Sequence, residues 1–161
     1  GRTLENLQGR ILAGALDAHI VLVVLARSDI GAAERARRLG LTSLVIGKAS
    51  HPDRERRDRL LEQAVLEARP DWVLLAGWLS LVPIPPSLAG RVLNIHPALL
   101  PDFGGAGFYG AKVHEAVAAS GARYSGCTVH LADAEYDRGP VLLQSAVMLT
   151  PGDDSAAPSG S

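Results

Sequence analysis

Short runs of consecutive apolar residues, separated by helical patterns, constrain the fold of this chain more than any other feature. Such runs occupy residues 19–26, 43–46, 72–76 and 91–95. They are typical of strands buried on both faces, as in a parallel sheet. Helical patterns lie between the first three of them. The order strand, helix, strand, helix, strand predicts βαβ units and a mostly parallel, twisted α/β sheet flanked by helices.

Capping residues set the expected ends of these helices. Asp29 is a candidate N-cap for the first one, and Gly40 is placed to end it. Ser50 and Asp53 have the spacing of a capping box at the start of the second helix. Pro70 stops that helix, because the residue before a proline disfavours the helical conformation.

The last third of the chain adds a helix and a hairpin. Residues 111–119 fit a helix, and two longer runs, residues 124–131 and 140–149, are predicted to pair as antiparallel strands. A length of 161 residues suits one domain. Residues 155–161 (SAAPSGS) have the composition of a linker or tail.

Charge and cysteine content exclude several classes of function. The net charge of −1 argues against a broad nucleic-acid or anionic-membrane surface. No apolar run reaches the roughly 18 residues that a membrane helix needs, and no signal-peptide pattern opens the sequence. The single cysteine has no disulfide partner, and no ligand cluster has a recognisable metal-site spacing. A cytoplasmic protein without a metal is therefore predicted.

Polar side chains lie at the ends of the last predicted strands and in the loop between two of them. The two-residue period of a strand puts Asn94 and His96 on one side, at the strand's carboxyl end, where ligands gather in parallel sheets. His130 shares a strand face with Thr128, and Asp137 lies in the loop before the final strand. Taken singly, each of these residues has an ordinary structural explanation: a hydrogen-bonded histidine or a turn aspartate.

The combination of motifs is more specific. The sequence contains LNIHPALLP, then GCTVHL, then an aspartate ahead of GPVLLQ, with AGWLSLVP before them and FGGAGFYGAKVHEAVAASGARYSG between. In this order the motifs resemble those of the folate-dependent formyltransferase family. Within it they look like the glycinamide ribonucleotide transformylase branch. The resemblance extends from about Gly1 to about Asp154, nearly the whole chain.

The resemblance implies a Rossmann-like formyltransferase domain over residues 1–154 with a C-terminal antiparallel hairpin. Family members have a central strand before the glycine loop and a helix after the hairpin. The sequence opens on that loop and closes soon after the hairpin, so the first strand and last helix are expected to be missing and the domain incomplete at both ends.

The resemblance also implies the reaction. Asn94, His96 and Asp137 would be the catalytic residues, moving a formyl group from 10-formyltetrahydrofolate to the amine of glycinamide ribonucleotide in purine biosynthesis. An amide and a protonated imidazole can stabilise the oxyanion of the tetrahedral intermediate. A carboxylate can hold the imidazolium charge and position a water that carries the proton.

Binding residues carried over from the family fall into two groups. The folate would contact a basic residue at the start of the second helix, apolar residues that follow one strand or lie in the next, and a histidine. These residues are Arg54, Trp78, Leu79, Leu81, Val82, Val92 and His130. The substrate phosphate would lie on the N-terminus of the first helix, at Gly1, Arg2 and Thr3, where free N–H groups attract anions. The alternatives are plain core for the apolar residues and solvent exposure for Arg54.

Three alternatives stay open at this stage. A 10-formyltetrahydrofolate hydrolase would use the same trio with water as the acceptor. A methionyl-tRNA formyltransferase would need a basic surface that the charge balance does not suggest. A non-catalytic folate- or nucleotide-binding paralogue would keep the scaffold without turnover. The oligomeric state, monomer or homodimer, is equally open.

Overall fold

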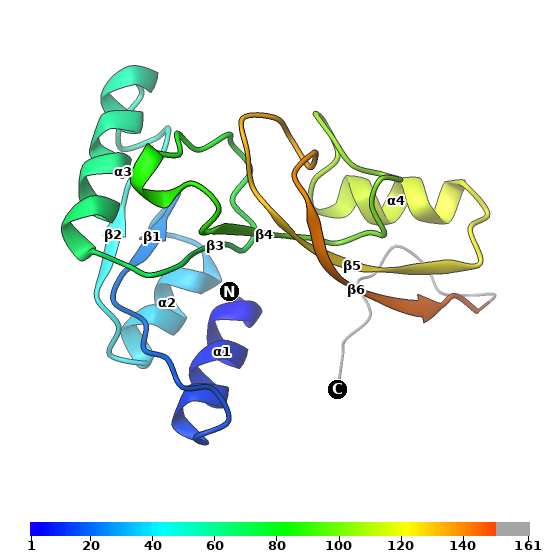
Figure 1. Cartoon of the computed structure of the whole chain (residues 1–161), viewed down its shortest axis with the longest axis horizontal. Coiled ribbons are helices and arrows are strands. Elements are labelled where there is room, and N and C mark those ends of the chain that lie inside the picture. The colour runs from blue at the N-terminus through cyan, green and yellow to red at the C-terminus, as the bar shows by residue number, and fades with distance from the viewer. Residues whose placement is uncertain (151–161) are drawn as a thin grey trace. The chain divides into compact units, whose positions relative to one another are not determined.

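The computed structural model describes residues 1–150, which form two compact units. The first unit is Gly1–Asp71, and the second begins at Trp72 (Figure 1). The predicted tail, residues 155–161, and the last residues of the predicted domain, 151–154, lie outside the described residues.

The first unit contains the predicted βαβ arrangement. Its elements in chain order are α1 (Arg2–Leu12), β1 (Val23–Leu25), α2 (Gly31–Arg38), β2 (Ser43–Val45) and α3 (Arg54–Ala68). Strands β1 and β2 pair in parallel, with Val24 opposite Leu44. Helix α2 packs against both strands, and α1 packs against α2. Glu5 of α1 joins the two helices by ion pairs to Arg35, at 3.0 Å, and to Arg38.

The helix ends confirm part of the prediction and correct part of it. The Asp29 cap was wrong: Ile30 is the N-cap of α2, and the Asp29 carboxylate accepts a 2.8 Å hydrogen bond from Arg27 instead. Gly40 follows the C-cap with a φ of 67°, which glycine adopts without the Cβ penalty of other residues. Asp53 alone caps α3, through the backbone N–H of Arg56 at 2.7 Å.

The capping box expected at α3 therefore does not form. The hydroxyl of Ser50 contacts the backbone of Gly47 and does not reach the first turn of the helix. Helix α3 ends at Ala68, two residues before Pro70, as predicted. Strand β1 is shorter than the apolar run that predicted it, because within residues 1–150 its pairing with another strand covers residues 23–25.

The second unit is a four-stranded mixed sheet with one helix beside it. Its elements are β3 (Val73–Leu75), the short 3-10 helix η1 (Pro86–Leu88), β4 (Val92–His96), α4 (Ala111–Ala119), β5 (Tyr124–Leu131) and β6 (Val141–Met148). The strand order is β3-β4-β5-β6. The β3–β4 pair is parallel, whereas β4–β5 and β5–β6 are antiparallel.

This pairing confirms the α/β class and the C-terminal hairpin. Within residues 1–150, however, the strands form two separate sheets rather than one, and two of the four strand pairs are antiparallel. The pairing of β4 with β5 places Asn94 opposite His130 and His96 opposite Thr128. The polar residues that the sequence set on one face of each strand therefore meet across the sheet.

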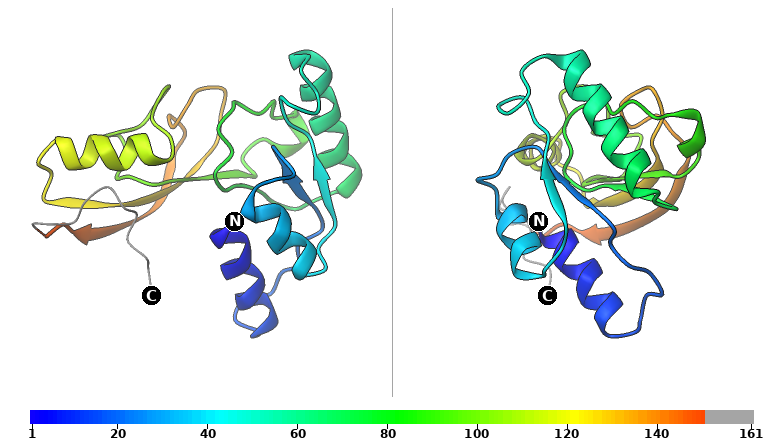
Figure 2. Two further views of the ribbon diagram at one scale, coloured as in Figure 1. Left: turned by 180° about the vertical axis from the view of Figure 1, so that it is seen from behind. Right: turned by 90° about the vertical axis from the view of Figure 1, so that its left-hand side faces the viewer.

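A small apolar core fixes the segment that follows β4. Val113 and Val117, one helical turn apart on α4, are buried together with Ala98. Phe103 lies against this cluster. Helix α4 lies along the side of β5 in Figures 1 and 2. Burying a valine side chain contributes about 1.5–3 kcal/mol, so this core is able to hold residues 98–103 in place.

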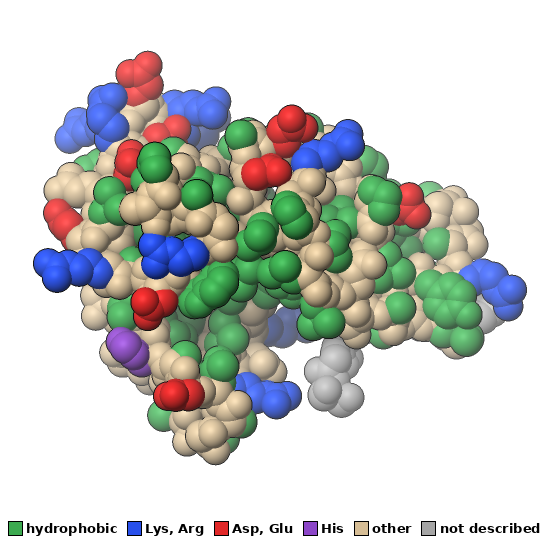
Figure 3. Space-filling model, viewed as in Figure 1, with side chains coloured by type: hydrophobic (Ala, Val, Ile, Leu, Met, Phe, Trp, Pro, Cys, Tyr) green, Lys and Arg blue, Asp and Glu red, His purple; other side chains and the backbone are tan. Residues whose placement is uncertain are grey.

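The surface carries charges of both signs. On the face drawn in Figure 3, basic and acidic side chains are interspersed, with no broad area of one sign. None of the helices described in residues 1–150 has the length and apolar character required to cross a membrane.

Candidate active site

Asn94 occupies the centre of a polar cluster at the end of β4. Its amide nitrogen donates to the Oδ1 atom of Asp137 at 3.2 Å and lies 3.0 Å from the Nε2 atom of His130. The other ring nitrogen of His130 lies 2.9 Å from the carbonyl oxygen of Leu131. A carbonyl only accepts, so Nδ1 carries the proton and Nε2 accepts from Asn94. Both N–H groups of the Asn94 amide are thus engaged within the protein.

His96 lies beside this pair and is nearly fully buried, with 3% of its surface exposed. Its Nε2 atom donates to the backbone carbonyl of Phe103 at 2.8 Å. Its Nδ1 atom faces the Oδ2 atom of Asp137 at 3.5 Å. The ring is therefore held between a carbonyl acceptor and a carboxylate.

Asp137 collects donors from three directions. Its carboxylate accepts from Asn94 and from the backbone N–H of Gly105 at 2.9 Å, and it faces the rings of His96 and His130. Its φ of 55° is in the left-handed region, which aspartate tolerates better than most residues. Phe103, in the facing loop, has a φ of 54°. Unusual backbone conformations often cluster at functional sites.

The surroundings of Asp137 favour its charged form. Burial opposes ionisation, but the Nε2–H that a protonated His130 turns towards the carboxylate, the Gly105 N–H and the neighbouring imidazoles outweigh it. The pKa of Asp137 therefore lies below its ordinary value. Conversely, the Asp137 carboxylate raises the pKa of His130 above its ordinary value, although burial opposes this. Protonation of His130 requires the Asn94 N–H to turn away from Nε2.

A pH dependence of stability follows for His130. A raised pKa in the folded state stabilises the fold below the unfolded pKa of about 6.5, and this contribution is lost as pH rises through the folded pKa. We expect the free energy of unfolding of the wild type to fall across this range. Asp137→Asn should flatten this slope, because the carboxylate that raises the His130 pKa is gone. Urea unfolding at a series of pH values measures both slopes; equal slopes would contradict the assignment.

The loop between β4 and α4 is anchored by Thr128, which is fully buried on β5. The Thr128 hydroxyl donates to the carbonyl of Ala98 at 2.7 Å and accepts from the N–H of Leu100 at 3.0 Å. The side-chain amide of Gln144 on β6 donates to Thr128 at 3.0 Å and to the carbonyl of Leu100 at 2.9 Å. The Thr128 hydroxyl and the Gln144 amide thus bind three backbone groups of the loop: the carbonyl of Ala98 and both the N–H and the carbonyl of Leu100.

Thr128→Val tests this anchor. Valine has the same shape but leaves Ala98, Leu100 and Gln144 without their shared partner. Unsatisfied buried polar groups cost about 1–3 kcal/mol each, and one kcal/mol corresponds to roughly 2–4 °C in a protein of this size. We expect a Tm lower by at least about 6 °C, measured by calorimetry. Thr42→Val, a threonine elsewhere in the chain, controls for loss of a hydroxyl; equal effects would contradict the role of Thr128.

The structure places most of the predicted folate residues in the second unit. Trp78, Leu79, Leu81 and Val82 lie between β3 and η1, and Val92 is buried in β4. Leu79 leaves 56% of its surface exposed. The backbone N–H of Leu81 donates to the hydroxyl of Tyr136 at 3.2 Å, which ties this segment to the Asp137 loop. His130 lies inside the polar cluster around Asn94.

The remaining predicted residues lie in the first unit. Gly1 is the N-cap of α1, with Arg2 and Thr3 in its first turn, so the predicted loop-to-helix start is confirmed. Arg54 begins α3, is exposed, and pairs with Asp58 at 3.6 Å. The binding roles of these four residues stay predictions.

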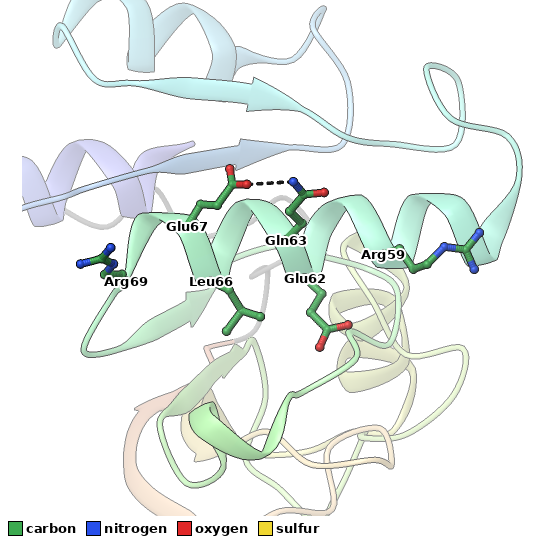
Figure 4. A pocket seen from close by; sticks show the side chains of 6 residues that line it. All are labelled: Arg59, Glu62, Gln63, Leu66, Glu67 and Arg69. Carbon is green, nitrogen blue, oxygen red and sulfur yellow. Dashed lines mark hydrogen bonds between the residues drawn. The ribbon is translucent and has the colours of Figure 1, made fainter.

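A shallow hollow also lies along α3, but it contains none of the predicted site residues. Figure 4 shows its lining and the 2.8 Å hydrogen bond between Gln63 and Glu67. The lining residues are Arg59, Glu62, Gln63, Leu66, Glu67 and Arg69. Charged groups of both signs on one helix face are typical of a solvated surface.

Several groups of the cluster were not predicted from the sequence. The carbonyl of Phe103 and the N–H of Gly105 are backbone groups, for which residue type gives no signal. Gln144 was visible only as the last residue of the GPVLLQ motif. Across residues 1–150, no group of three or more side chains is arranged to hold a metal ion.

Comparisons with known proteins show the family to which the chain belongs. The family model described as "Formyl transferase" matches residues 1–158. A phosphoribosylglycinamide formyltransferase of Arabidopsis thaliana, named as chloroplastic, is 47% identical over 87% of this chain and 49% of its own length. One from Mycobacterium tuberculosis is 37% identical over 91% of this chain and 69% of its own length. The chain thus spans about half the length of the Arabidopsis relative.

Solved structures share the same fold. Glycinamide ribonucleotide transformylase 1 from Symbiobacterium toebii superposes with a TM-score of 0.82 at 34% identity, covering 94% of this chain and 70% of that one. A formyltetrahydrofolate deformylase from Pseudomonas syringae gives a TM-score of 0.79 at 25% identity, covering 94% of this chain and 49% of that one. The family match over nearly the whole sequence and these structural likenesses lead to one conclusion: the chain belongs to the formyl transferase family.

Proposed function

We propose that this chain carries the catalytic site of a phosphoribosylglycinamide formyltransferase, which transfers the formyl group of 10-formyltetrahydrofolate to the amine of glycinamide ribonucleotide. The observation that carries the proposal is the contact of Asp137 with Asn94, His96 and His130 in one buried cluster. The relatives named above support the choice of acceptor.

The reaction needs one bond made, one broken and one proton moved. The acceptor amine attacks the formyl carbon, and the carbonyl electrons move onto oxygen to give a tetrahedral oxyanion. Collapse of this intermediate breaks the bond to the folate nitrogen. The attacking nitrogen loses a proton, and the leaving nitrogen gains one. Asp137, ionised because its pKa is lowered, positions the water that carries this proton.

Asn94 is the donor proposed for the oxyanion. Both of its amide N–H groups bind protein partners in the structure, so one must turn towards the formyl oxygen when substrate is present. The bond to His130 is the one that protonation of that ring releases. A proton on His130 would therefore free an N–H of Asn94 for the reaction, while Nε2 of the ring turns to Asp137, 3.4 Å away.

His96 supplies positive charge at the same place. Its two ring nitrogens face the Phe103 carbonyl and the Asp137 carboxylate, an arrangement that suits an imidazolium. A protonated His96 stabilises the developing oxyanion by its charge, and Asp137 compensates that charge in the ground state. No nucleophilic side chain of the protein is required, since the amine of the substrate attacks the formyl carbon directly.

The folate and phosphate subsites complete the proposal. Trp78, Leu79, Leu81 and Val82 would contact the pterin, with Val92 behind them, and Arg54 would face the glutamate tail. The exposed fraction of Leu79 suits an apolar ring that covers it. The phosphate would bind the first turn of α1 at Gly1, Arg2 and Thr3, where four backbone N–H groups lack helical partners.

A 10-formyltetrahydrofolate hydrolase is the second candidate. The likeness to the Pseudomonas syringae deformylase favours it, because that protein shares the fold. Water would then replace the amine, and the same carboxylate would activate it. The higher identity of the chain to proteins named as formyltransferases favours the transferase.

The compartment and assembly are part of the proposal. The sequence predicted the cytoplasm, whereas the Arabidopsis relative is named chloroplastic, so a plastid is the alternative. Microscopy of the tagged protein separates the two. Monomer and homodimer both stay open, and sedimentation of the purified protein decides between them.

Turnover with two acceptors tests the function. The purified protein is mixed with 10-formyltetrahydrofolate, and loss of donor is followed with and without glycinamide ribonucleotide. Turnover that requires the ribonucleotide supports the transferase. Turnover at the same rate without it identifies the hydrolase. Folate binding without turnover under either condition would support a non-catalytic paralogue.

A further inference from the structure

We propose that Gln144 is a positioning residue for the catalytic carboxylate and imidazole, acting through the loop that joins β4 to α4. The inference rests on the proposed function and adds a residue from β6 to it. Asp137 lies in the β5–β6 connection, whereas the Gln144 amide binds Thr128 and Leu100. It acts on the backbone segment that contacts both His96 and Asp137.

The register of the sheet places Gln144 in a row of three residues. His96 on β4 is opposite Thr128 on β5, and Thr128 is opposite Gln144 on β6. The Gln144 amide donates one hydrogen bond to the Thr128 hydroxyl at 3.0 Å and one to the carbonyl of Leu100 at 2.9 Å. It therefore connects the edge strand directly to the loop that follows β4.

The far end of that loop contacts the catalytic residues. The carbonyl of Phe103 accepts from His96 at 2.8 Å, and the N–H of Gly105 donates to Asp137 at 2.9 Å. Gly104 between them packs tightly, since a Cβ there would overlap the side chain of Leu100 and lie 3.3 Å from the Cβ of Asp137. A shift of Leu100 is thus passed on to both contacts.

Glutamine is suited to this position by its chemistry. Its amide presents two donors without a charge, and the structure uses one for a carbonyl and the other for a hydroxyl that already donates to Ala98. Glutamate has nearly the same shape but offers only acceptors when ionised, so it would repel the carbonyl of Leu100. Leucine offers neither donor nor acceptor.

Release of the loop should change catalysis in a specific way. If Gly105 moves away, Asp137 loses one of the hydrogen bonds that lower its pKa. The groups that still face Asp137 are His96, His130 and Asn94, and Asp133 lies close enough to act on His130. The acid limb of the pH–rate profile should therefore move to higher pH, whereas the folate and phosphate contacts are untouched.

The test compares Gln144→Glu and Gln144→Leu with a control on the same strand, Leu143→Gln. Leu143 is 65% exposed and takes no part in the cluster. We expect both Gln144 variants to lower kcat by about tenfold to hundredfold, in line with a misplacement of roughly 1 Å. KM for both substrates should stay within about twofold of the wild type, and the acid limb of the pH–rate profile should move to higher pH. The control should match the wild type.

A second measurement does not depend on turnover. The ring resonances of His96 and His130 are titrated by NMR in the wild type and in the more conservative Gln144→Glu variant. Altered titration of His96 supports the positioning role even if the wild type transfers no formyl group, in which case only the proposed function fails. If the wild type turns over while both variants keep its kcat, pH profile and ring titrations, the positioning role is overturned.

Discussion

Asp137→Asn is expected to lower kcat/KM for formyl transfer by about 10³-fold. The substitution keeps the size of the side chain but removes its negative charge. Four neighbouring groups face that charge: Asn94, His96, His130 and the N–H of Gly105. In the proposed mechanism this charge balances the positive charge of His96 and positions the water that carries the proton, and both functions are lost in the variant. Steady-state kinetics with both substrates measures the effect.

A carboxylate in the same loop provides the control. Glu135 is exposed, and Glu135→Gln changes the net charge by the same amount. We expect its kcat/KM to stay within about twofold of the wild type, since surface substitutions usually have small effects. An Asp137→Asn protein that retains more than a fifth of the wild-type rate would remove Asp137 from the mechanism.

Asn94→Leu should give the second largest loss, about 10²–10³-fold in kcat. Leucine approximates the shape of asparagine but cannot donate to the oxyanion of the tetrahedral intermediate. Because that charge exists only on the reaction path, kcat should fall while KM for the folate changes little. Rapid-quench measurement of a single turnover separates the chemical step from product release.

A rise in KM at unchanged kcat would show that Asn94 only binds substrate. The variant also removes a hydrogen bond to His130, so the ring titration of His130 serves as a check on local structure. Near-ultraviolet circular dichroism shows whether the second unit remains folded in the variant. A spectrum like that of the wild type excludes global unfolding as the cause of any loss.

The sequence was sufficient for the part of the site that depends on strand periodicity. Asn94 and His96 alternate with apolar residues along one strand, so their shared face followed from the two-residue period. The hairpin was visible as two apolar runs, with Asp137 in the polar loop between them. One hydrogen bond joins Asn94 to Asp137, two residues that only the family resemblance had grouped, while the catalytic roles stay proposals.

The remaining contacts depend on tertiary structure. Register between β5 and β6 shifts at residues 129–130, so the alignment of Gln144 with Thr128 could not be read from spacing alone. The backbone groups of Phe103 and Gly105 reach the site only because the loop folds back over β4. Local competition explains the wrong N-cap: the Arg27 guanidinium binds Asp29 and removes it from α2.

The most direct test of the account follows the formyl carbon itself. The protein is incubated with ¹³C-formyl-labelled 10-formyltetrahydrofolate and glycinamide ribonucleotide, and ¹³C NMR shows where the label goes. We expect label on the ribonucleotide as a formamide, formed at least about 10²-fold more slowly with Asp137→Asn. Label recovered only as formate, or formed equally fast with both proteins, would contradict it.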